Sequence, residues 1–300
     1  MVPLADSYTA IVEQAGVADR TGLDLVGIQD HPYQRRFLDT FALMADLLAR
    51  TDRVRVFPDV ASLPMRPPAM IAKAAASLDV MSRGRFELGL GAGAFWDAVA
   101  GMGGAVRQAG ERLRGLDQAL AIIRAALDVG AERGVVRSEA DLYPEHRYPA
   151  GPPPAHRVEI WVGAMSPGAL RLIGRAADGW VPGGGTSRID DFARLTSLID
   201  DAALEAGRDP TSIRRVVNIS GTITDHGAAD TVGDAGRYAP GGASALGGPV
   251  AAWVETLTRW SIELGLDTYV LWPSEADPIG QIERFANEVA PAVRDNVGTP

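Results

Sequence analysis

A histidine follows an aspartate at the point where a predicted strand ends. Asp30 and His31 come directly after the apolar run 23–28, and Pro32 restricts the backbone of His31 to extended conformations. Functional groups of parallel α/β folds gather at the carboxyl ends of strands. Because a neutral histidine titrates near working pH, His31 is a candidate proton donor or hydrogen-bond partner at a reacting centre. The alternative is a structural histidine bonded to backbone at the rim of the fold.

A serine–proline pair forms the most readable anion site. Ser166 at the N-cap and Pro167 at the first helical position make a preorganised helix start after the strand 158–162. The free N–H groups and the helix dipole, worth about 0.3–1 kcal/mol, suit a phosphate. The alternative is that the serine only caps its helix.

Glycines and small residues follow several other predicted strands. The segment 89–94 fits the dinucleotide pattern G-x-G-x-x-A, but no long helix is predicted directly after it. Its glycines also suit a backbone that approaches something bulky. Few residues after the strands are charged, which favours a large flat cofactor over a sugar or a metal cluster. These residues include Asp59, Val60, Ser62, Gly91, Gly93, Gly163, Ala164, Met165, Gly183–Thr186, Trp272 and Glu275.

Composition excludes several classes of function. The 29 basic and 38 acidic residues give a net charge of −9, which argues against nucleic-acid binding. The absence of cysteine excludes disulfides, thiolate metal sites and a cysteine nucleophile. Neither a signal peptide nor an apolar run long enough for a membrane span is visible, so we expect a cytoplasmic protein without membrane contact. Of the remaining histidines, His146, His156 and His226 are expected at the surface.

Short β-branched runs alternate with amphipathic stretches, a pattern that predicts βαβ units and a mostly parallel sheet. The clearest helix is 111–129, with leucine and isoleucine at helical spacing. Every predicted helix except the first, 7–21, has a strand before it. This favours a single (β/α)8 barrel domain over 1–300 with a short or missing first strand at 2–4. An irregular excursion covers 130–157 and a Gly-rich loop covers 225–248. The alternative is an open doubly wound parallel sheet.

Three blocks of sequence resemble the luciferase-like monooxygenase superfamily, in particular its coenzyme F420-dependent oxidoreductase branch. They are LDLVGIQDHP at 23–32, ASLDVMSRGRFELGLGAG at 76–93, and IWVGAMSP at 160–167 together with ADGW at 177–180. The resemblance extends over about 16–293. It implies a (β/α)8 barrel that holds a flavin or deazaflavin at the carboxyl-terminal mouth of its strands.

The resemblance also implies roles for individual residues. Asp30 and His31 would face the reactive ring as the catalytic residues, and Ser166 would hold the cofactor phosphate. The Asp59–Val60 bond matches a position where many members carry a cis peptide under the ring. The remaining cofactor-binding candidates are Gly91, Gly93, Gly163 and Ala164. The segment 227–248 would be a lid, and the usual assembly would be a homodimer.

The expected activity is therefore hydride transfer between coenzyme F420 and a small organic substrate. An FMN-dependent monooxygenase is the nearest alternative, because the same pocket would serve oxygen chemistry. A non-catalytic flavin-binding barrel and a nicotinamide dehydrogenase that uses 89–94 are the other two hypotheses.

Overall fold

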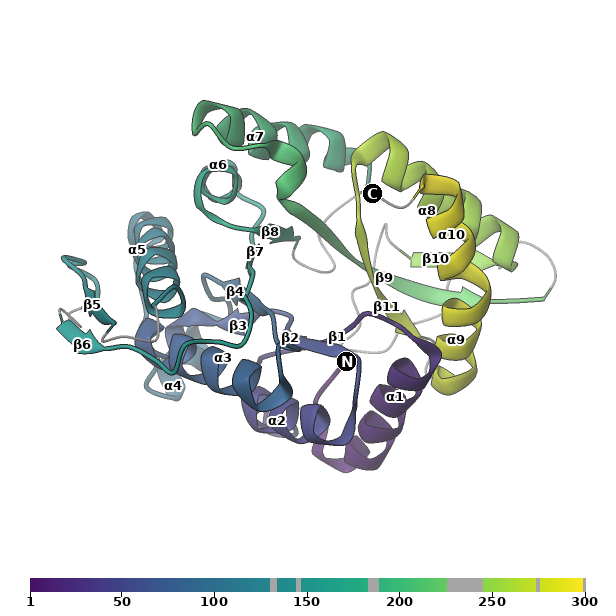
Figure 1. Cartoon of the computed structure of the whole chain (residues 1–300), viewed down its shortest axis with the longest axis horizontal. Coiled ribbons are helices and arrows are strands. Elements are labelled where there is room, and N and C mark those ends of the chain that lie inside the picture. The colour runs from purple at the N-terminus through teal and green to yellow at the C-terminus, as the bar shows by residue number, and fades with distance from the viewer. Residues whose placement is uncertain (130–133, 144–146, 183–188, 226–244, 274–275, 299–300) are drawn as a thin grey trace.

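The computed structural model describes residues 1–129, 134–143, 147–182, 189–225, 245–273 and 276–298. Helices alternate with strands along most of the chain and lie outside the strands (Figure 1). The helices are α1 (Tyr8–Thr21), α2 (Thr40–Arg50), α3 (Pro68–Ser82), α4 (Trp96–Gly101), α5 (Ala109–Leu127), α6 (Pro167–Ala176), α7 (Phe192–Glu205), α8 (Val250–Leu264), α9 (Pro278–Arg284) and α10 (Ala290–Val297). The strands are β1 (Leu25–Ile28), β2 (Arg55–Pro58), β3 (Ala61–Ser62), β4 (Leu88–Gly91), β5 (Val135–Arg137), β6 (Arg147–Pro149), β7 (Ile160–Gly163), β8 (Gly179–Val181), β9 (Arg214–Ile223), β10 (Ala245–Gly248) and β11 (Thr268–Pro273). Within these ranges, no helix has the length and apolar character needed to cross a bilayer.

Single residues set several helix ends. Gly22 ends α1 in the left-handed conformation, with φ of +80°, which a residue without Cβ adopts at no steric cost. Asp39 begins α2, and its carboxylate accepts a hydrogen bond from the backbone N–H of Ala42 at 3.0 Å. Gln108 and Glu111 form a reciprocal capping box at the start of α5. Local sequence therefore fixes where these helices begin and end.

The strands pair almost entirely in parallel. β1 and β2 form a two-stranded sheet. In a second sheet β3, β4, β7, β8 and β9 are neighbours in that order, and β10 and β11 both pair with β9. A parallel bridge between Val56 and Phe86 links β2 to the segment that enters β4. The antiparallel ribbon β5–β6 is separate and projects beyond α5 (Figure 1). The predicted α/β class with a mostly parallel sheet is confirmed.

Side chains from opposite ends of the strand order meet in one inner cluster. The cluster consists of Phe57, Trp161, Val181, Val216 and Val270, with Leu25 and Val60 packed against it. Since β1 and β11 contribute to the same cluster, the sheet is strongly curved and its interior is filled, as in a barrel. Within the described residues, no backbone ladder joins β1 to β11.

Residues 1–4 form no regular strand. The Met1 carbonyl accepts a hydrogen bond from the Gln29 backbone at 3.1 Å, beside the end of β1. Leu4 instead forms an antiparallel bridge with Phe37. A short or missing first strand was expected here, and these contacts agree with it.

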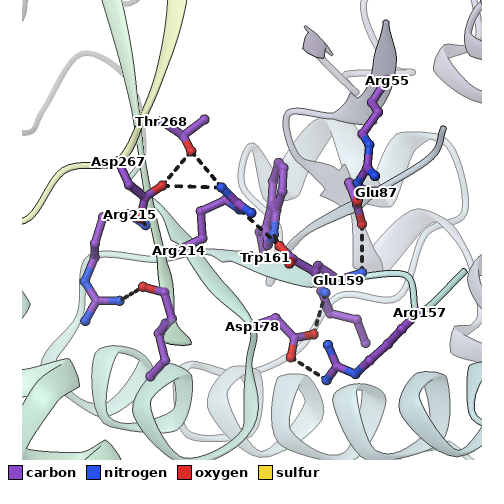
Figure 2. A network of polar contacts seen from close by, with 12 residues as sticks. Arg55, Glu87, Arg157, Glu159, Trp161, Asp178, Arg214, Arg215, Asp267 and Thr268 are labelled. Atoms are coloured by element: carbon purple, nitrogen blue, oxygen red, sulfur yellow. Dashed lines mark hydrogen bonds and ion pairs between the residues drawn. The ribbon is translucent and has the colours of Figure 1, made fainter. Parts of the chain in front are cut away.

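Charged side chains occupy the amino ends of the parallel strands (Figure 2). Arg55 at the start of β2 pairs with Glu87, which precedes β4. Glu159, which precedes β7, accepts from Nε of Arg214 at 3.1 Å, and Arg214 also reaches the Thr268 hydroxyl at 3.3 Å. We call these residues the amino-end network. It ties together β2, β4, β7, β9 and β11 at the end of the sheet opposite the strands' carboxyl ends.

One expectation about the histidines is wrong. His156 is half-buried rather than exposed: its Nδ1 lies 2.6 Å from Asp79 and its Nε2 3.1 Å from Glu87. Asp79 is fully buried and also accepts the backbone N–H of Ala155 at 2.6 Å. Because buried carboxylates need partners, this histidine ties the excursion to the amino-end network.

Other expectations fall partly or wholly outside the described ranges. The residues concerned are His146, His226, Gly183–Thr186, Glu275 and most of the Gly-rich loop at 225–248. The last four residues of that predicted loop form β10, parallel to β9, and are a strand instead.

Candidate active site

The sequence-predicted site residues all lie at the carboxyl ends of parallel strands. Asp30 and His31 follow β1, Asp59 and Val60 connect β2 to β3, and Ser166 follows β7. Paired parallel strands point the same way, so these ends share one edge of the curved sheet. The amino-end network occupies the opposite edge.

His31 lies in a cluster of aromatic rings. The His31 ring centroid is 5.6 Å from Tyr33, 6.4 Å from Phe37 and 5.6 Å from Phe95, the last in an edge-to-face arrangement. Its Nδ1 lies 2.7 Å from the Tyr33 hydroxyl. Burial lowers the pKa of His31 below its usual value, and the nearby Asp30 carboxylate offsets only part of that effect. His31 is therefore neutral at pH 7.

This environment predicts how His31 responds to pH. Its titration midpoint, followed by NMR in the folded protein, is expected below the ordinary 6.5. A histidine whose folded pKa is lowered binds fewer protons in the folded state, so the free energy of unfolding falls as pH drops from 6.5 through the folded midpoint. His31→Gln removes the titrating group. As pH drops below 6.5, the free energy of unfolding of the wild type should therefore fall by more than that of the variant. A midpoint at or above 6.5 contradicts the prediction.

Asp30 is held as an anchor. One carboxylate oxygen accepts the Ser62 backbone N–H at 2.9 Å and pairs with Arg66 at 2.8 Å. Arg66 in turn pairs with Asp39 at 2.6 Å, so the carboxyl end of β1 is tied to β3 and α2. The other oxygen of Asp30 is buried without a partner among the described residues, and burial raises the pKa of Asp30. A direct catalytic role for Asp30 stays a prediction.

Asp59 and Val60 lie between the carboxyl end of β2 and the start of β3. The peptide bond between them is cis, as the resemblance implies. One Asp59 oxygen lies 3.4 Å from the side-chain amide of Asn218 in β9, whose own oxygen accepts from the indole N–H of Trp272 at 2.8 Å. The other Asp59 oxygen is buried without a described partner, and burial raises the pKa of this carboxyl group. Sequence reasoning missed Asn218, although an asparagine inside a buried strand is a usable signal.

The Val60 side chain explains two of the predicted glycines. A Cβ on Gly91 or on Gly163 would lie 2.7 Å from Cγ2 of Val60, and the two glycines are paired across β4 and β7. Real Cβ atoms essentially never approach so closely. The glycines therefore make room for Val60, and their direct contact with a cofactor stays a prediction.

The glycine loop after β4 does not have the geometry of a dinucleotide site. Gly93 has φ of +104°, and a Cβ there would lie 2.4 Å from the Pro64 ring. The helix that follows, α4, has only six residues and begins at Trp96, with Phe95 rather than a glycine at its N-cap. A dinucleotide site needs a helix whose N-terminus meets the pyrophosphate directly after the glycines, so the geometry disfavours that alternative. Phe95 itself is 61% exposed with φ of +53°, an unusual conformation for a bulky residue.

Ser166 stands at the start of α6 with an uncommitted hydroxyl. It is exposed and has N-cap backbone geometry, yet its side chain makes no capping hydrogen bond. Ala164, two residues earlier, is half-buried, and its carbonyl accepts from the indole N–H of Trp180 at 2.8 Å. That bond fixes the turn between β7 and α6.

These residues fit a flat cofactor that carries a phosphate. Because the Ser166 hydroxyl makes no capping hydrogen bond, both this hydroxyl and the first N–H groups of α6 are free to bind an anion. Val60 and Ala164 present half-buried apolar surface at the neighbouring strand ends, which suits a ring. His31 follows β1 at the same edge of the sheet.

The sequence matches the family model described as luciferase-like monooxygenase over residues 2–238. One relative is the phthiodiolone/phenolphthiodiolone dimycocerosates ketoreductase of Mycobacterium tuberculosis, which is 34% identical over 212 residues, 67% of this chain. The matches cover 51% of that ketoreductase and 62% of another mycobacterial relative. The chain thus spans less than two thirds of the curated relatives that it matches.

Solved structures share the fold. An F420-dependent secondary alcohol dehydrogenase in complex with an F420–acetone adduct superposes with a TM-score of 0.81 at 20% identity, covering 98% of this chain and 97% of that one. The oxygenating constituent of 3,6-diketocamphane monooxygenase from Pseudomonas putida, in complex with FMN, gives a TM-score of 0.70 at 18% identity. That match covers 95% of this chain and 92% of the monooxygenase. At such identities the likeness establishes the fold alone.

Proposed function

The chain belongs to the luciferase-like monooxygenase family, and from this premise we propose that it transfers a hydride between coenzyme F420 and a small organic carbonyl compound or alcohol. The observation that carries the proposal is the contact between His31 Nδ1 and the Tyr33 hydroxyl at the same sheet edge as the start of α6, whose N-cap serine makes no capping hydrogen bond. The ketoreductase relative and the alcohol dehydrogenase fold neighbour support the choice of substrate class.

Each residue then has a definite task. When bound, the cofactor supplies the hydride chemistry. Ser166 and the first turn of α6 hold its phosphate, and Val60 and Ala164 support its ring. His31 exchanges the proton that accompanies the hydride: the carbonyl oxygen gains it on reduction, and the alcohol loses it on oxidation. Asp30, through Ser62 and Arg66, holds the end of β1 in place.

An FMN-dependent monooxygenase is the second candidate function. It is favoured by the fold neighbour that binds FMN, because a phosphate at α6 and a ring over Val60 serve either cofactor. We further propose that the protein is cytoplasmic and homodimeric. Sedimentation of the purified protein tests the dimer, and cell fractionation tests the location.

Cofactor titration of the purified protein decides between the candidates. We expect saturable binding of coenzyme F420 in the micromolar range and weaker binding of FMN, followed by absorption and fluorescence. Stronger FMN binding with oxygen uptake would support the monooxygenase. Binding of neither cofactor would overturn both and leave a non-catalytic barrel, while saturation by a nicotinamide alone would revive the dehydrogenase hypothesis.

The phosphate position is tested by Ser166→Asp. Aspartate is as good an N-cap residue as serine, so the melting temperature should hold or rise slightly. The new carboxylate repels the phosphate, and we expect cofactor affinity to fall by about tenfold or more. Ser7→Asp is a matched control, because Ser7 also stands at an N-cap without a capping bond. Unchanged affinity in Ser166→Asp would remove Ser166 from the site.

A further inference from the structure

His31, the candidate proton donor, forms a direct side-chain hydrogen bond with Tyr33. The Tyr33 oxygen lies 2.7 Å from Nδ1 of His31, and the two ring centroids are 5.6 Å apart. Phe95 lies 5.7 Å from Tyr33 and 5.6 Å from His31, so the three rings support one another. Only Pro32 separates the two partners in sequence, and its ring limits the backbone freedom between them.

The acid–base chemistry of the pair says which group donates. Burial, with the Asp30 carboxylate nearby, raises the pKa of Tyr33 to about 12, so the phenol keeps its proton at any working pH. His31 is neutral under the same conditions, and a neutral imidazole has one nitrogen that accepts and one that donates. A phenol is the better donor and an imidazole nitrogen the better acceptor. The hydrogen bond therefore runs from the Tyr33 hydroxyl to Nδ1.

The charged surroundings do not favour the opposite arrangement. Asp30 is the carboxylate that acts on both His31 and Tyr33. Its bound oxygen is taken by Ser62 and Arg66. No residue of the described ranges other than Tyr33 is within hydrogen-bond distance of the His31 ring. The hydroxyl of Tyr33 is thus the one described group that selects the tautomer.

We propose that Tyr33 is a positioning residue: its hydroxyl donates to Nδ1 of His31 and keeps the ring proton on Nε2. Nε2 lies on the side of the ring away from Nδ1, so the remaining N–H is the group that His31 offers to a ligand. A protonated ring nitrogen seeks an acceptor oxygen. His31 thereby donates a hydrogen bond from Nε2–H to a substrate carbonyl oxygen and polarises it. On reduction, the Nε2 proton would pass to that oxygen while the Tyr33 hydroxyl proton passes to Nδ1, so the ring stays neutral and solvent returns a proton to Tyr33.

The action of His31 on a substrate carbonyl rests on the proposed function, whereas the assignment of the tautomer does not. It deepens that function by naming ketones and aldehydes as the substrate class that the resting tautomer would recognise. The tautomer can be measured in the protein without any cofactor, so the two ideas can fail separately.

The test is ¹⁵N NMR of the His31 ring in the unloaded protein at a pH above its midpoint. We expect the proton on Nε2 in the wild type. A typical hydrogen bond is worth about 0.5–1.5 kcal/mol, so Tyr33→Phe should reduce the ratio of the two tautomers about 2- to 13-fold. The Nδ1 resonance should also move toward that of an unbonded acceptor nitrogen. Tyr8→Phe is the matched control. It deletes a tyrosine hydroxyl in α1 that donates to Asp46 at 2.7 Å, and it should leave the His31 tautomer unchanged.

A second substitution keeps the ring and its size. Fluorotyrosine at position 33 is a stronger donor, so it should raise the tautomer ratio where phenylalanine lowers it. A wild-type proton on Nδ1, or a ratio that neither change moves, would overturn the proposal. In the loaded enzyme, Tyr33→Phe should lower kcat for ketone reduction with little change in KM. If NMR shows the expected tautomer but no cofactor binds, the proposed function fails and the role of Tyr33 stands.

Discussion

His31→Asn is expected to lower kcat for hydride transfer by about 10²–10⁴-fold while cofactor affinity changes little. General acid–base groups contribute rate factors of this size, and His31 is the one histidine of the described ranges at the strands' carboxyl ends. Asparagine can still donate a hydrogen bond but cannot exchange a proton near neutral pH. Stopped-flow measurement of cofactor oxidation with a saturating ketone gives the rate directly.

The matched control is His156→Asn, the same change at a histidine that bridges Asp79 and Glu87. It leaves two buried carboxylates short of a partner, so it should lower the free energy of unfolding without changing kcat per folded molecule. A His31→Asn enzyme within threefold of wild type would remove His31 from the reaction. Equal losses of kcat in both variants would point to a general structural effect.

Gly89→Ala is expected to lower the free energy of unfolding by more than about 4 kcal/mol. A Cβ on Gly89 would lie 2.1 Å from the backbone carbonyl oxygen of Pro58, and backbone at the end of β2 has no room to move. Gly163→Ala clashes instead with the Val60 side chain at 2.7 Å, and overpacking of this kind costs about 1–3 kcal/mol.

The contrast gives a double-mutant test by urea denaturation. Val60→Ala should rescue much of the Gly163→Ala loss, because it removes the methyl groups that the new Cβ meets. It should not rescue Gly89→Ala. Additive losses for Val60→Ala and Gly163→Ala would show that the inner face of the sheet relaxes in another way.

Much of the fold follows from local sequence. The N-cap Asp39, the terminal Gly22 and the long apolar stripe of α5 each determine a helix with information inside a few residues. The strands ended close to the predicted positions, so the residues at their carboxyl ends could be named in advance. The resemblance to a family supplied the position of the cis bond at Asp59–Val60.

The contacts between those residues could not be predicted in the same way. Asn218 meets Asp59 across 159 positions of sequence, and nothing local to either residue indicates the partner. Gly91 and Gly163 were expected beside a cofactor, but a glycine does not say which atom uses its space, and here Val60 does. His156 was misplaced because its two carboxylates lie 69 and 77 positions away.

The amino-end network has a practical consequence for protein engineering. The ion pairs and hydrogen bonds of Arg55, Glu87, Glu159 and Arg214 join the amino ends of the strands, at the opposite end of the sheet from the loops that follow the strands (Figure 2). Random libraries confined to those loops, such as residues 34–37 and 97–106, leave the amino-end network intact and also spare Tyr33 and Phe95. Selection for new ketones can therefore vary the residues around the site without removing the ion pairs that join the strands at their other end.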